Sequence, residues 1–496
     1  MMSPDIDRPS RTEQTMDAIL GFLDTINTYM YTWVLIYVLA AVGIYFTVRT
    51  RGMQLRMFPA MIRTILHSGR HEGTGITPFQ AFSIGLASRV GTGNIAGVAI
   101  AITLGGPGAV FWMWVIALIG MATAFVEATL AQVFKVSWPD GTYRGGPAFY
   151  IWRGLKSWRW GAAFAVALLF TFGIAFEMVQ ANTIAQTLDA SHGVPVWVSA
   201  IALAILTGAV ILGGIKAVAR VAEWVAPIMA GLYILLALVI LVLNIDRLGF
   251  VFYEIIASAF GLNEALAGTA GGVTAALLNG VKRGLYSNEA GMGSAPNAAS
   301  TATTSHPARQ GLIQSMGVFV DTMLICSATA FVILLSDASV YAPGMDVEGA
   351  TLTQSAVAHH LGEWMTLPMT ILIFTFAYST IIGNYAYAEV NLDYLTGRKH
   401  EHDLALRLVV IASVVVGAFL KLDVVWSLAD VSMGVMALIN LVAIVLLGKW
   451  AFGTLRDFTE RKGAPFVATD NPYLPGKLES DIWVADNPTL ARLPEQ

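Results

Sequence analysis

The sequence predicts an all-α membrane protein with eleven transmembrane helices. Two observations predict this class: 56% of the 496 residues are hydrophobic, and only 12% are charged. Soluble domains carry about 25% charged residues, so most of this chain has no water-facing surface to cover. We expect a lipid bilayer as its environment. We expect neither nucleic acid nor a nucleotide as a partner, and the sequence contains no GxxxxGKS or GxxxxGKT phosphate-binding loop.

The apolar runs are long enough to cross a bilayer, whose core of about 30 Å needs about 20 residues of helix. The predicted spans are 29–49, 77–104, 107–134, 160–189, 194–214, 221–245, 269–303, 310–336, 364–394, 404–421 and 425–448. Two further stretches, 50–70 and 251–267, are predicted to lie in the membrane interface. The first alternates Arg with Met, Leu and Ile, as a basic amphipathic surface helix does.

The basic residues predict the orientation, because short loops rich in Lys and Arg stay on the cytoplasmic side. With the N-terminus outside, the basic clusters at 49–70, 135–159 and 398–407 all lie inside, together with the chain after residue 449. An even number of spans would not separate the charges so completely. Prolines and polar residues alternate after about residue 457, which predicts a mostly irregular cytoplasmic tail.

Two of the predicted spans are interrupted by polar and helix-breaking residues. Span 77–104 contains "SRVGTGNIAG" and span 269–303 contains "VKRGLYSNEAGMGSAPNAAS". They open two sets of five spans, and an odd number of spans inverts the second set in the membrane. Paired glycine-interrupted segments at matching positions predict a transporter with inverted repeats. The alternative is that these glycines only let helices pack closely.

This pattern divides the chain into six predicted parts. They are an N-terminal segment (1–28), a first span with the basic interfacial helix (29–70), a first five-helix repeat (77–245), an outer loop or interfacial helix (246–268), a second repeat (269–448) and the tail (449–496). Unwound backbone at mid-membrane exposes N–H and C=O groups that hydrocarbon cannot satisfy. The N–H groups can bind a carboxylate and the carbonyls can bind a cation, so we expect a solute site between the two breaks.

Long, nearly continuous motifs in the same region resemble the alanine/glycine:cation symporter family. They are residues 88–131, "YRGGPAFY" (143–150), "NGVKRGLYSNEAGMGSAPNAAS" (279–300), "HPARQGLIQSMGVFVDT" (306–322) and "FAYSTIIGNYAYAE" (376–389). The resemblance spans about residues 80–450. It implies a leucine-transporter-type fold, with one extra helix before a five-plus-five core, in a bacterial cytoplasmic (inner) membrane. It also implies uptake of small neutral amino acids, alanine and glycine foremost, together with Na⁺.

The resemblance further implies which residues hold the ion. Ser379 and Thr380 are adjacent hydroxyl residues at the middle of span 364–394. With backbone carbonyls of Ala87, Val90 and Phe376, they would bind Na⁺, a hard cation that prefers oxygen ligands. The alternative is that both hydroxyls bond only to their own helix.

Substrate residues are implied in the same way. Gly91, Thr92 and Gly93 would offer N–H groups to the substrate carboxylate, and Asn94 could reach substrate or ion. Gly291 and Met292 would form the facing wall, with Gln180 as a third wall. Asn384 departs from the family pattern as we know it, in which some members carry Trp at this position. If it lines the pocket, Asn leaves more room and adds polarity, which keeps serine or a larger neutral amino acid open as substrate.

Charged residues inside the spans are costly and are usually paired or functional. We expect Arg89 to pair with an acid near the breaks, Glu289 first, and we expect Asp393 and Arg398 to form an inner gate. A proton-coupled symporter of another neutral amino acid, such as serine or glutamine, is the main alternative function, with Glu289 or another membrane acid as the carrier. A channel or an amino-acid sensor is less well supported. An enzyme is the least supported class, because no nucleophile–base pair or metal cluster emerges.

Overall fold

The computed structural model describes residues 11–69, 75–262, 270–342, 345, 349–397 and 403–485, with side chains from residue 17 onward except at 270 and 271. Helices make up almost all of the regular structure in this part of the chain. The helices before the middle of the sequence are α1 (Arg11–Met30), η1 (Tyr31–Leu35), α2 (Ile36–Arg49), α3 (Met53–Arg56), α4 (Phe58–Leu66), α5 (Pro78–Arg89), η2 (Gly93–Gly97), α6 (Val98–Gly105), α7 (Gly108–Val133), α8 (Pro147–Leu155), α9 (Trp158–Phe170), η3 (Thr171–Ala175), α10 (Phe176–His192), α11 (Val196–Ile211) and α12 (Gly214–Leu243).

The second half continues with α13 (Leu248–Ala259), α14 (Ala270–Asn288), α15 (Ala295–Thr301), α16 (Pro307–Val318), η4 (Phe319–Cys326), α17 (Ser327–Leu334), α18 (Gly349–Leu361), η5 (Glu363–Met365), α19 (Thr366–Thr396), α20 (Asp403–Phe419) and α21 (Leu422–Glu460). Two short strands, β1 (Val136–Ser137) and β2 (Tyr143–Arg144), pair antiparallel as a hairpin, with Val136 opposite Arg144.

Within the described residues, seven helices are long and apolar enough to cross a membrane. They are Asp17–Arg49, Gly108–Val133, Trp158–His192, Gly214–Leu243, Pro307–Leu334, Glu363–Thr396 and Leu422–Glu460. The pair Pro78–Arg89 and Gly93–Gly105 passes the same test as one span that bends by 48° at its break. The structure therefore has the helical membrane class that the composition predicts, whereas the count of eleven spans stays a prediction.

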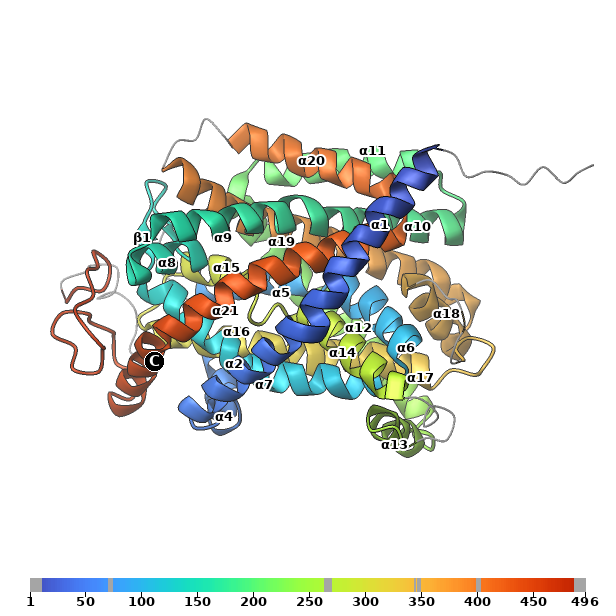
Figure 1. Cartoon of the computed structure of the whole chain (residues 1–496), viewed down its shortest axis with the longest axis horizontal. Coiled ribbons are helices and arrows are strands. Elements are labelled where there is room, and N and C mark those ends of the chain that lie inside the picture. The colour runs from blue at the N-terminus through green and yellow to red at the C-terminus, as the bar shows by residue number, and fades with distance from the viewer. Residues whose placement is uncertain are drawn as a thin grey trace, which may run out of the picture.

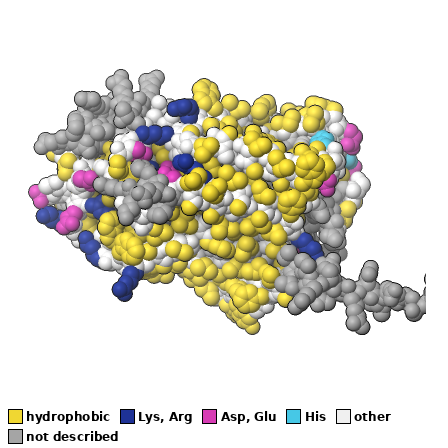
Figure 2. All heavy atoms as spheres, turned by 90° about the horizontal axis from the view of Figure 1, so that it is seen from above, with side chains coloured by type: hydrophobic (Ala, Val, Ile, Leu, Met, Phe, Trp, Pro, Cys, Tyr) yellow, Lys and Arg dark blue, Asp and Glu magenta, His cyan; other side chains and the backbone are white. Residues whose placement is uncertain are grey.

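Most of the helices run along the long axis of the molecule (Figure 1). The β-hairpin, α8 and the end of α21 lie at one end, which we call the tail end. The helices α6, α13, α17 and α18 lie toward the other end, which we call the vestibule end. Hydrophobic side chains cover the middle of the face seen in Figure 2, and charged side chains gather toward the two ends. This banding is what a bilayer requires of a spanning protein.

Some boundaries differ from those expected, because contacts distant in sequence decide them. The first span was expected from residue 29, but the helix starts at Arg11 and reaches Arg49 through the π-helical turn η1. Its added turns are anchored to α21, where the Ser427 hydroxyl donates to Asp24 at 2.5 Å and the Asn27 amide donates to the Ser427 carbonyl at 3.1 Å. The hairpin, α8 and α18 were not predicted from the sequence at all.

The chain after α21 also differs from a loose tail. Its backbone is irregular between residue 461 and residue 485, as expected, but the Phe466 and Trp483 side chains are completely buried. Proline-rich polar composition predicted the irregular backbone correctly. It carried no sign that two aromatic residues would find partners on the tail end of the bundle.

Substitution of Gly417 tests how closely α10 and α20 must approach each other. A Cβ at Gly417 of α20 would lie 2.3 Å from the Met178 Cα of α10, and backbone cannot move aside like a side chain. We expect Gly417→Ala to lower the free energy of unfolding by about 1–3 kcal/mol, as overpacking does. Loss of the monodisperse peak after heating in detergent measures this.

The matched control is Gly231→Ala on α12, where an added Cβ meets nothing within 4 Å. If both variants kept the parent's thermal stability, the crossing of α10 and α20 would not be as tight as described.

Candidate functional site

The first broken helix supplies one side of the candidate site. The helix α5 ends at Arg89, and Val90 leaves helical geometry with φ −82° and ψ 86°. Gly91 and Thr92 then lead into η2. A Cβ at Gly91 would lie 2.1 Å from the hydroxyl oxygen of Thr380, so only glycine lets α19 approach the backbone here.

The second broken helix lies between α14 and α15. Glu289, Gly291 and Gly293 have φ values of 59°, 97° and 81°, in the region that side chains rarely adopt. Glycine occupies two of these three positions, as this geometry favours, and Glu289 is the exception. Pro296 lies in the first turn of α15, where its missing N–H leaves no bond unmade.

A carboxylate on a neighbouring helix accepts hydrogen bonds from the backbone N–H groups of the second break. Glu127 of α7 is buried, and it accepts hydrogen bonds from the backbone N–H groups of Gly291 and Gly293, both at 3.1 Å. Asn440 of α21 donates to Glu127 at 2.5 Å and to the Gly291 carbonyl at 2.9 Å. The sequence alone assigned no role to Glu127. No local motif marks it, because its partners lie more than 160 residues away in the chain.

The predicted ion residues meet at the first break. The Thr380 hydroxyl lies 3.0 Å from the Ala87 carbonyl of α5 and 3.1 Å from the Phe376 carbonyl. The Ser379 hydroxyl lies 2.9 Å from the Phe376 carbonyl and also contacts Met229. Oxygens from two helices therefore gather here, and all are uncharged, which fits a hard monovalent cation. Val90 is the capping residue of α5 beside this group.

Asn94 joins the two broken helices through a buried acid. Its side-chain oxygen accepts the Gly91 N–H at 2.9 Å, and its amide donates to the Asp321 carboxylate at 2.6 Å. The Ser287 hydroxyl of α14 donates to the other oxygen of Asp321 at 2.7 Å, as does Thr322 at 2.8 Å. Asp321 lies in the π-helical segment η4, a feature frequent at functional sites. The sequence alone assigned no role to Asp321.

Gln180 contacts the first break from α10. Its side-chain oxygen accepts the Thr92 N–H at 3.3 Å, and its amide donates to the Tyr286 hydroxyl at 3.1 Å. The ring of Tyr286 stacks on Phe176 with 4.5 Å between centroids. Gln180 thus links the first break to α14, and its role as a third wall of the substrate site stays a prediction.

The facing wall differs in detail from the one expected. A Cβ at Gly93 would meet Tyr286 at 2.9 Å and Ser287 at 3.2 Å, so these two residues stand opposite the first break. Gly291 instead faces Leu39, Leu441 and Thr123, on the other side of the broken helix. Met292 is buried in the same turn. Which residue of this segment faces the first break depends on the turn geometry, and the assignment of the wall to a substrate stays a prediction.

Asn384 lies one helical turn beyond Thr380 on α19 and is fully buried. Its side-chain oxygen lies 2.8 Å from the Ser88 hydroxyl, whose single proton is shared with Glu289. Its amide nitrogen has no hydrogen-bond partner within the part of the chain that the structure describes. A buried donor without a partner is costly, so this group is suited to meet a polar atom from outside the protein.

The expected pairing of Arg89 with Glu289 is not present. Glu289 instead accepts hydrogen bonds from Ser88 at 2.8 Å and from Ser294 at 2.6 Å. Arg89 donates to the Gln314 carbonyl at 3.4 Å, and no described carboxylate lies within ion-pair distance of it. Hydroxyl groups from both breaks can approach the carboxylate more closely than a bulky guanidinium in this crowded region.

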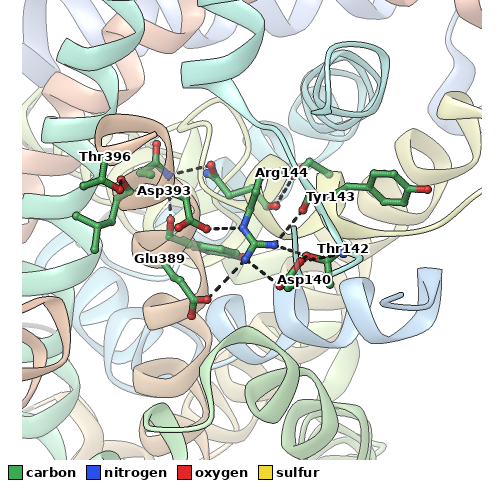
Figure 3. A network of polar contacts seen from close by, with 12 residues as sticks. Asp140, Thr142, Tyr143, Arg144, Glu389, Asp393 and Thr396 are labelled. Atoms are coloured by element: carbon green, nitrogen blue, oxygen red, sulfur yellow. Dashed lines mark hydrogen bonds and ion pairs between the residues drawn. The ribbon is translucent and has the colours of Figure 1, made fainter. Parts of the chain in front are cut away.

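An ionic network closes the tail end of the bundle. Figure 3 shows Arg144 of the β-hairpin between three carboxylates: Asp393 at 2.6 Å, Asp140 at 3.5 Å and Glu389 at 3.7 Å. We call these four residues the tail-end network. The expectation that Asp393 forms a gate with Arg398 is corrected in part, because Arg144 is its partner here and Arg398 lies outside the described residues.

Asp140 is the member of this network that lies in a loop outside the spans. Burial raises its pKa, but the hydrogen bonds from Thr142 and the charge of Arg144 outweigh it, so the pKa lies below its usual range. The network therefore keeps a charged carboxylate beside Arg144. One cation among several anions holds the hairpin against α19.

A second ionic contact lies on the vestibule side. Arg283 of α14 pairs with Asp430 of α21 at 2.5 Å and stands over the ring of Trp426 at 4.4 Å. These residues line a cavity of about 1010 Å³, the vestibule, together with Asp24, Lys282 and Thr187 among others. Tyr286 contacts Trp426 at 4.6 Å, so aromatic rings separate the vestibule from Gln180 and the first break. The site thus lies between two ionic closures.

Comparison with solved structures supports the fold. A manganese transporter from Eremococcus coleocola matches with a TM-score of 0.53 and 13% identity, over 83% of this chain and 85% of that one. The transporter MhsT, solved with L-phenylalanine, matches with a TM-score of 0.50 and 15% identity, over 79% and 90%. These likenesses concern the fold alone, and they agree with the expected leucine-transporter-type architecture.

Sequence comparison gives much closer relatives. The "Probable sodium/glutamine symporter GlnT" of Bacillus subtilis (strain 168) is 46% identical over 454 residues, 91% of this chain and 92% of that protein. The "Putative sodium/proton-dependent alanine carrier protein YrbD" of the same organism is 41% identical, over 93% of this chain and 97% of that protein. The "Sodium/alanine symporter AgcS" of Methanococcus maripaludis is 39% identical, over 89% and 97%.

These relatives are all named as transporters, so the expectation that the chain is not an enzyme is confirmed. Residues 16–468 match the profile described as "Sodium:alanine symporter family". The region includes both breaks, α19 with its hydroxyl pair, and both ionic closures. Because the match covers this whole region, the chain belongs to the sodium:alanine symporter family.

Proposed function

We propose that this protein is a sodium-coupled symporter that imports small neutral amino acids, alanine and glycine foremost, across the bacterial cytoplasmic membrane. The observation that carries the proposal is the contact of Thr380 with the Ala87 carbonyl at 3.0 Å. It joins a hydroxyl of α19 to the end of a half-helix, beside the Gly91 and Thr92 amides. An ion bound there would hold both elements together, so its binding would favour the conformation that receives substrate.

The substrate would lie between the first break and the wall made by Tyr286 and Ser287. In the structure the Gly91 and Thr92 N–H groups are bonded to the side chains of Asn94 and Gln180. A substrate carboxylate would replace these neutral acceptors with a charged one, which forms stronger hydrogen bonds. Asn94 and Gln180 would then be released to contact the substrate or the ion.

The orientation that we propose places the tail end in the cytoplasm. Lys135, Arg144 and Arg153 belong to this end, in agreement with the cytoplasmic preference of basic loops. The vestibule and the Arg283–Asp430 pair would then face outward, and the tail-end network would face inward. Import would open the first closure and then the second, never both together.

The energy of one sodium ion is sufficient for such a cycle. One charge that moves through about 100 mV gains about 2.3 kcal/mol. A tenfold concentration gradient adds about 1.4 kcal/mol. The sum of about 3.7 kcal/mol could hold a neutral amino acid roughly 500-fold above its outside concentration.

Asn384 favours a substrate range wider than alanine and glycine. Its unpartnered amide N–H could donate a hydrogen bond to the side-chain hydroxyl or carboxamide of a substrate. In addition, a relative at 46% identity is named as a sodium/glutamine symporter. Serine or glutamine would then compete with alanine. This extends the proposal without changing the fold, the ion site or the direction of transport.

Proton coupling is the second candidate, and two observations favour it. Glu289 and Asp321 are both buried beside the breaks, and neither has a basic partner at ion-pair distance among the described residues. A relative at 41% identity is named sodium/proton-dependent. Either acid could carry a proton in place of the sodium ion, whereas the Ser379/Thr380 pair has no titratable group.

We expect Thr380→Ala to reduce Na⁺-dependent alanine uptake in proteoliposomes by about tenfold or more, because a lost ligand worth about 1.4 kcal/mol weakens binding tenfold. The matched control is Thr375→Ala on the same helix, whose exposed hydroxyl bonds only to its own helix at Ile371. Equal uptake by the parent and Thr380→Ala would remove this site assignment. Undiminished uptake with choline in place of Na⁺ would remove sodium coupling altogether.

We expect Asn384→Ala to change the order of competing substrates. Unlabelled serine and glutamine should inhibit labelled alanine uptake less in the variant, by a factor of about 5–10, since a hydrogen bond to a neutral group is worth about 1 kcal/mol. Inhibition by glycine, which has no side-chain acceptor, serves as the internal reference. If all competitors keep their rank, Asn384 does not contact the substrate side chain.

We expect a pH gradient alone to drive no uptake. Proteoliposomes with an acidic exterior and choline in place of Na⁺ should accumulate no alanine, because the ion site of Ser379 and Thr380 requires a metal cation. Accumulation under these conditions, abolished in Asp321→Asn or Glu289→Gln, would instead establish the proton-coupled candidate and identify its carrier.

A further inference from the structure

The segment after α21 is docked on the tail end of the bundle rather than free of it. Trp483 is completely buried, and its ring N–H donates to the backbone carbonyl of Gln132, at the end of α7, at 3.0 Å. Phe466 is also completely buried and contacts the Trp483 ring edge-on at 5.5 Å. The backbone N–H of Ala468 donates to the Trp483 carbonyl at 2.8 Å, which closes the segment on itself. We call residues 464–483 the strap.

The strap is bonded to the chain that follows the second broken helix. The Phe466 N–H donates to the Ser305 carbonyl at 2.9 Å, and the Phe466 ring lies 5.2 Å from His306. Both residues belong to the short connection between α15 and α16. The strap therefore touches the inner end of the half-helix α15 within a few residues of its last turn.

The same connection is bonded to the start of the first broken helix. Ala302 pairs with Ile76 in an isolated parallel bridge, and the Thr303 N–H donates to the Ile76 carbonyl at 2.9 Å. Ile76 immediately precedes Thr77, the residue that caps α5. The inner ends of both half-helices thus meet at one point, and the strap covers the connection that makes this contact.

A buried lysine ties the strap to the same point. The Lys135 ammonium donates to the Ala302 carbonyl at 2.8 Å, and it lies 4.9 Å from the centre of the Trp483 ring and 4.0 Å from that of Tyr143. Cation–π contacts of this kind are stronger when water is excluded, and Lys135 is only 1% exposed. Removing the Trp483 ring would expose this ammonium to water on one side.

We propose that the strap holds the tail end closed and sets how often it opens. This inference rests on the proposed transport cycle, in which α5 and α15 separate at their inner ends to release substrate. That separation must break the Ile76–Ala302 contact, and the docked strap stabilises one of the two elements that would move. Undocking would shift the population toward the form that is open at the tail end, without any change in the ion or substrate residues.

A cysteine reporter can measure this shift without any transport assay, so failure of the strap and failure of the proposed function are separable. Thr303 is 3% exposed beside the Ile76 contact, and the native Cys326 is buried. In purified full-length protein, maleimide labelling of Thr303→Cys reports the open fraction, because labelling of a transiently opened site follows its equilibrium population. The parent without the reporter gives the background rate.

We expect Trp483→Ala to accelerate labelling of Thr303→Cys about tenfold. Trp483→Phe keeps an apolar ring and removes the hydrogen bond to Gln132, so it should give a smaller increase and remains useful if the alanine variant does not fold. Lys477→Ala, an exposed position of the strap, is the matched control and should leave the rate unchanged. An unchanged rate in the folded Trp483 variants would overturn the proposal.

A second reporter position shows whether the strap acts on the tail end alone or stabilises the whole bundle. Thr103→Cys lines the vestibule, at the other end of the molecule. If the strap controls alternating access, Trp483→Ala leaves labelling at this position unchanged or slows it. If labelling rises by the same factor at both ends, the tail only stabilises the whole bundle and the proposal is wrong.

Discussion

The rest of the site depends on one interaction, in which the Glu127 carboxylate accepts hydrogen bonds from the backbone N–H groups of the second break. Hydrocarbon offers no partner to a free N–H group, so a helix can break inside a membrane only where protein supplies one. Glu127 supplies it for Gly291 and Gly293, and Asn440 binds both the carboxylate and the Gly291 carbonyl. The second break is therefore held by α7 and α21, and Glu289 bonds it to Ser88 beside the first break.

The first break is held by the residues that would serve transport. Asn94, Gln180 and Thr380 bond to its amides or lie beside its carbonyls, and each comes from a different helix or from the break itself. The two breaks thus differ in purpose. One is fixed by the buried Glu127 side chain, whereas the other is bonded to neutral side chains that a carboxylate and a cation can replace. This difference suits a site that must bind and release in every cycle.

At each end of the candidate site a single arginine is paired with buried or partly buried carboxylates. Arg283 pairs with Asp430 below the vestibule, and Arg144 lies among Asp140, Glu389 and Asp393 at the tail end. Such pairs cost desolvation energy when they form in a buried place and are costly to separate when one partner is left alone. They are therefore well suited to two-state closures. At the tail end, the docked strap adds apolar burial and a cation–π contact to this ionic layer.

The sequence by itself determined the helical membrane class, the places of both breaks and the hydroxyl pair on α19, because composition, glycine placement and family motifs are local properties of the chain. It did not reveal that Glu127 binds the second break, that Ser88 and Ser294 rather than Arg89 bind Glu289, or that Trp483 docks under α7. Apart from the local contact of Ser294 with Glu289, each of these depends on residues far apart in the chain that meet only after packing. Their partners are backbone groups or hydroxyls that no spacing marks, so only the tertiary structure could decide them.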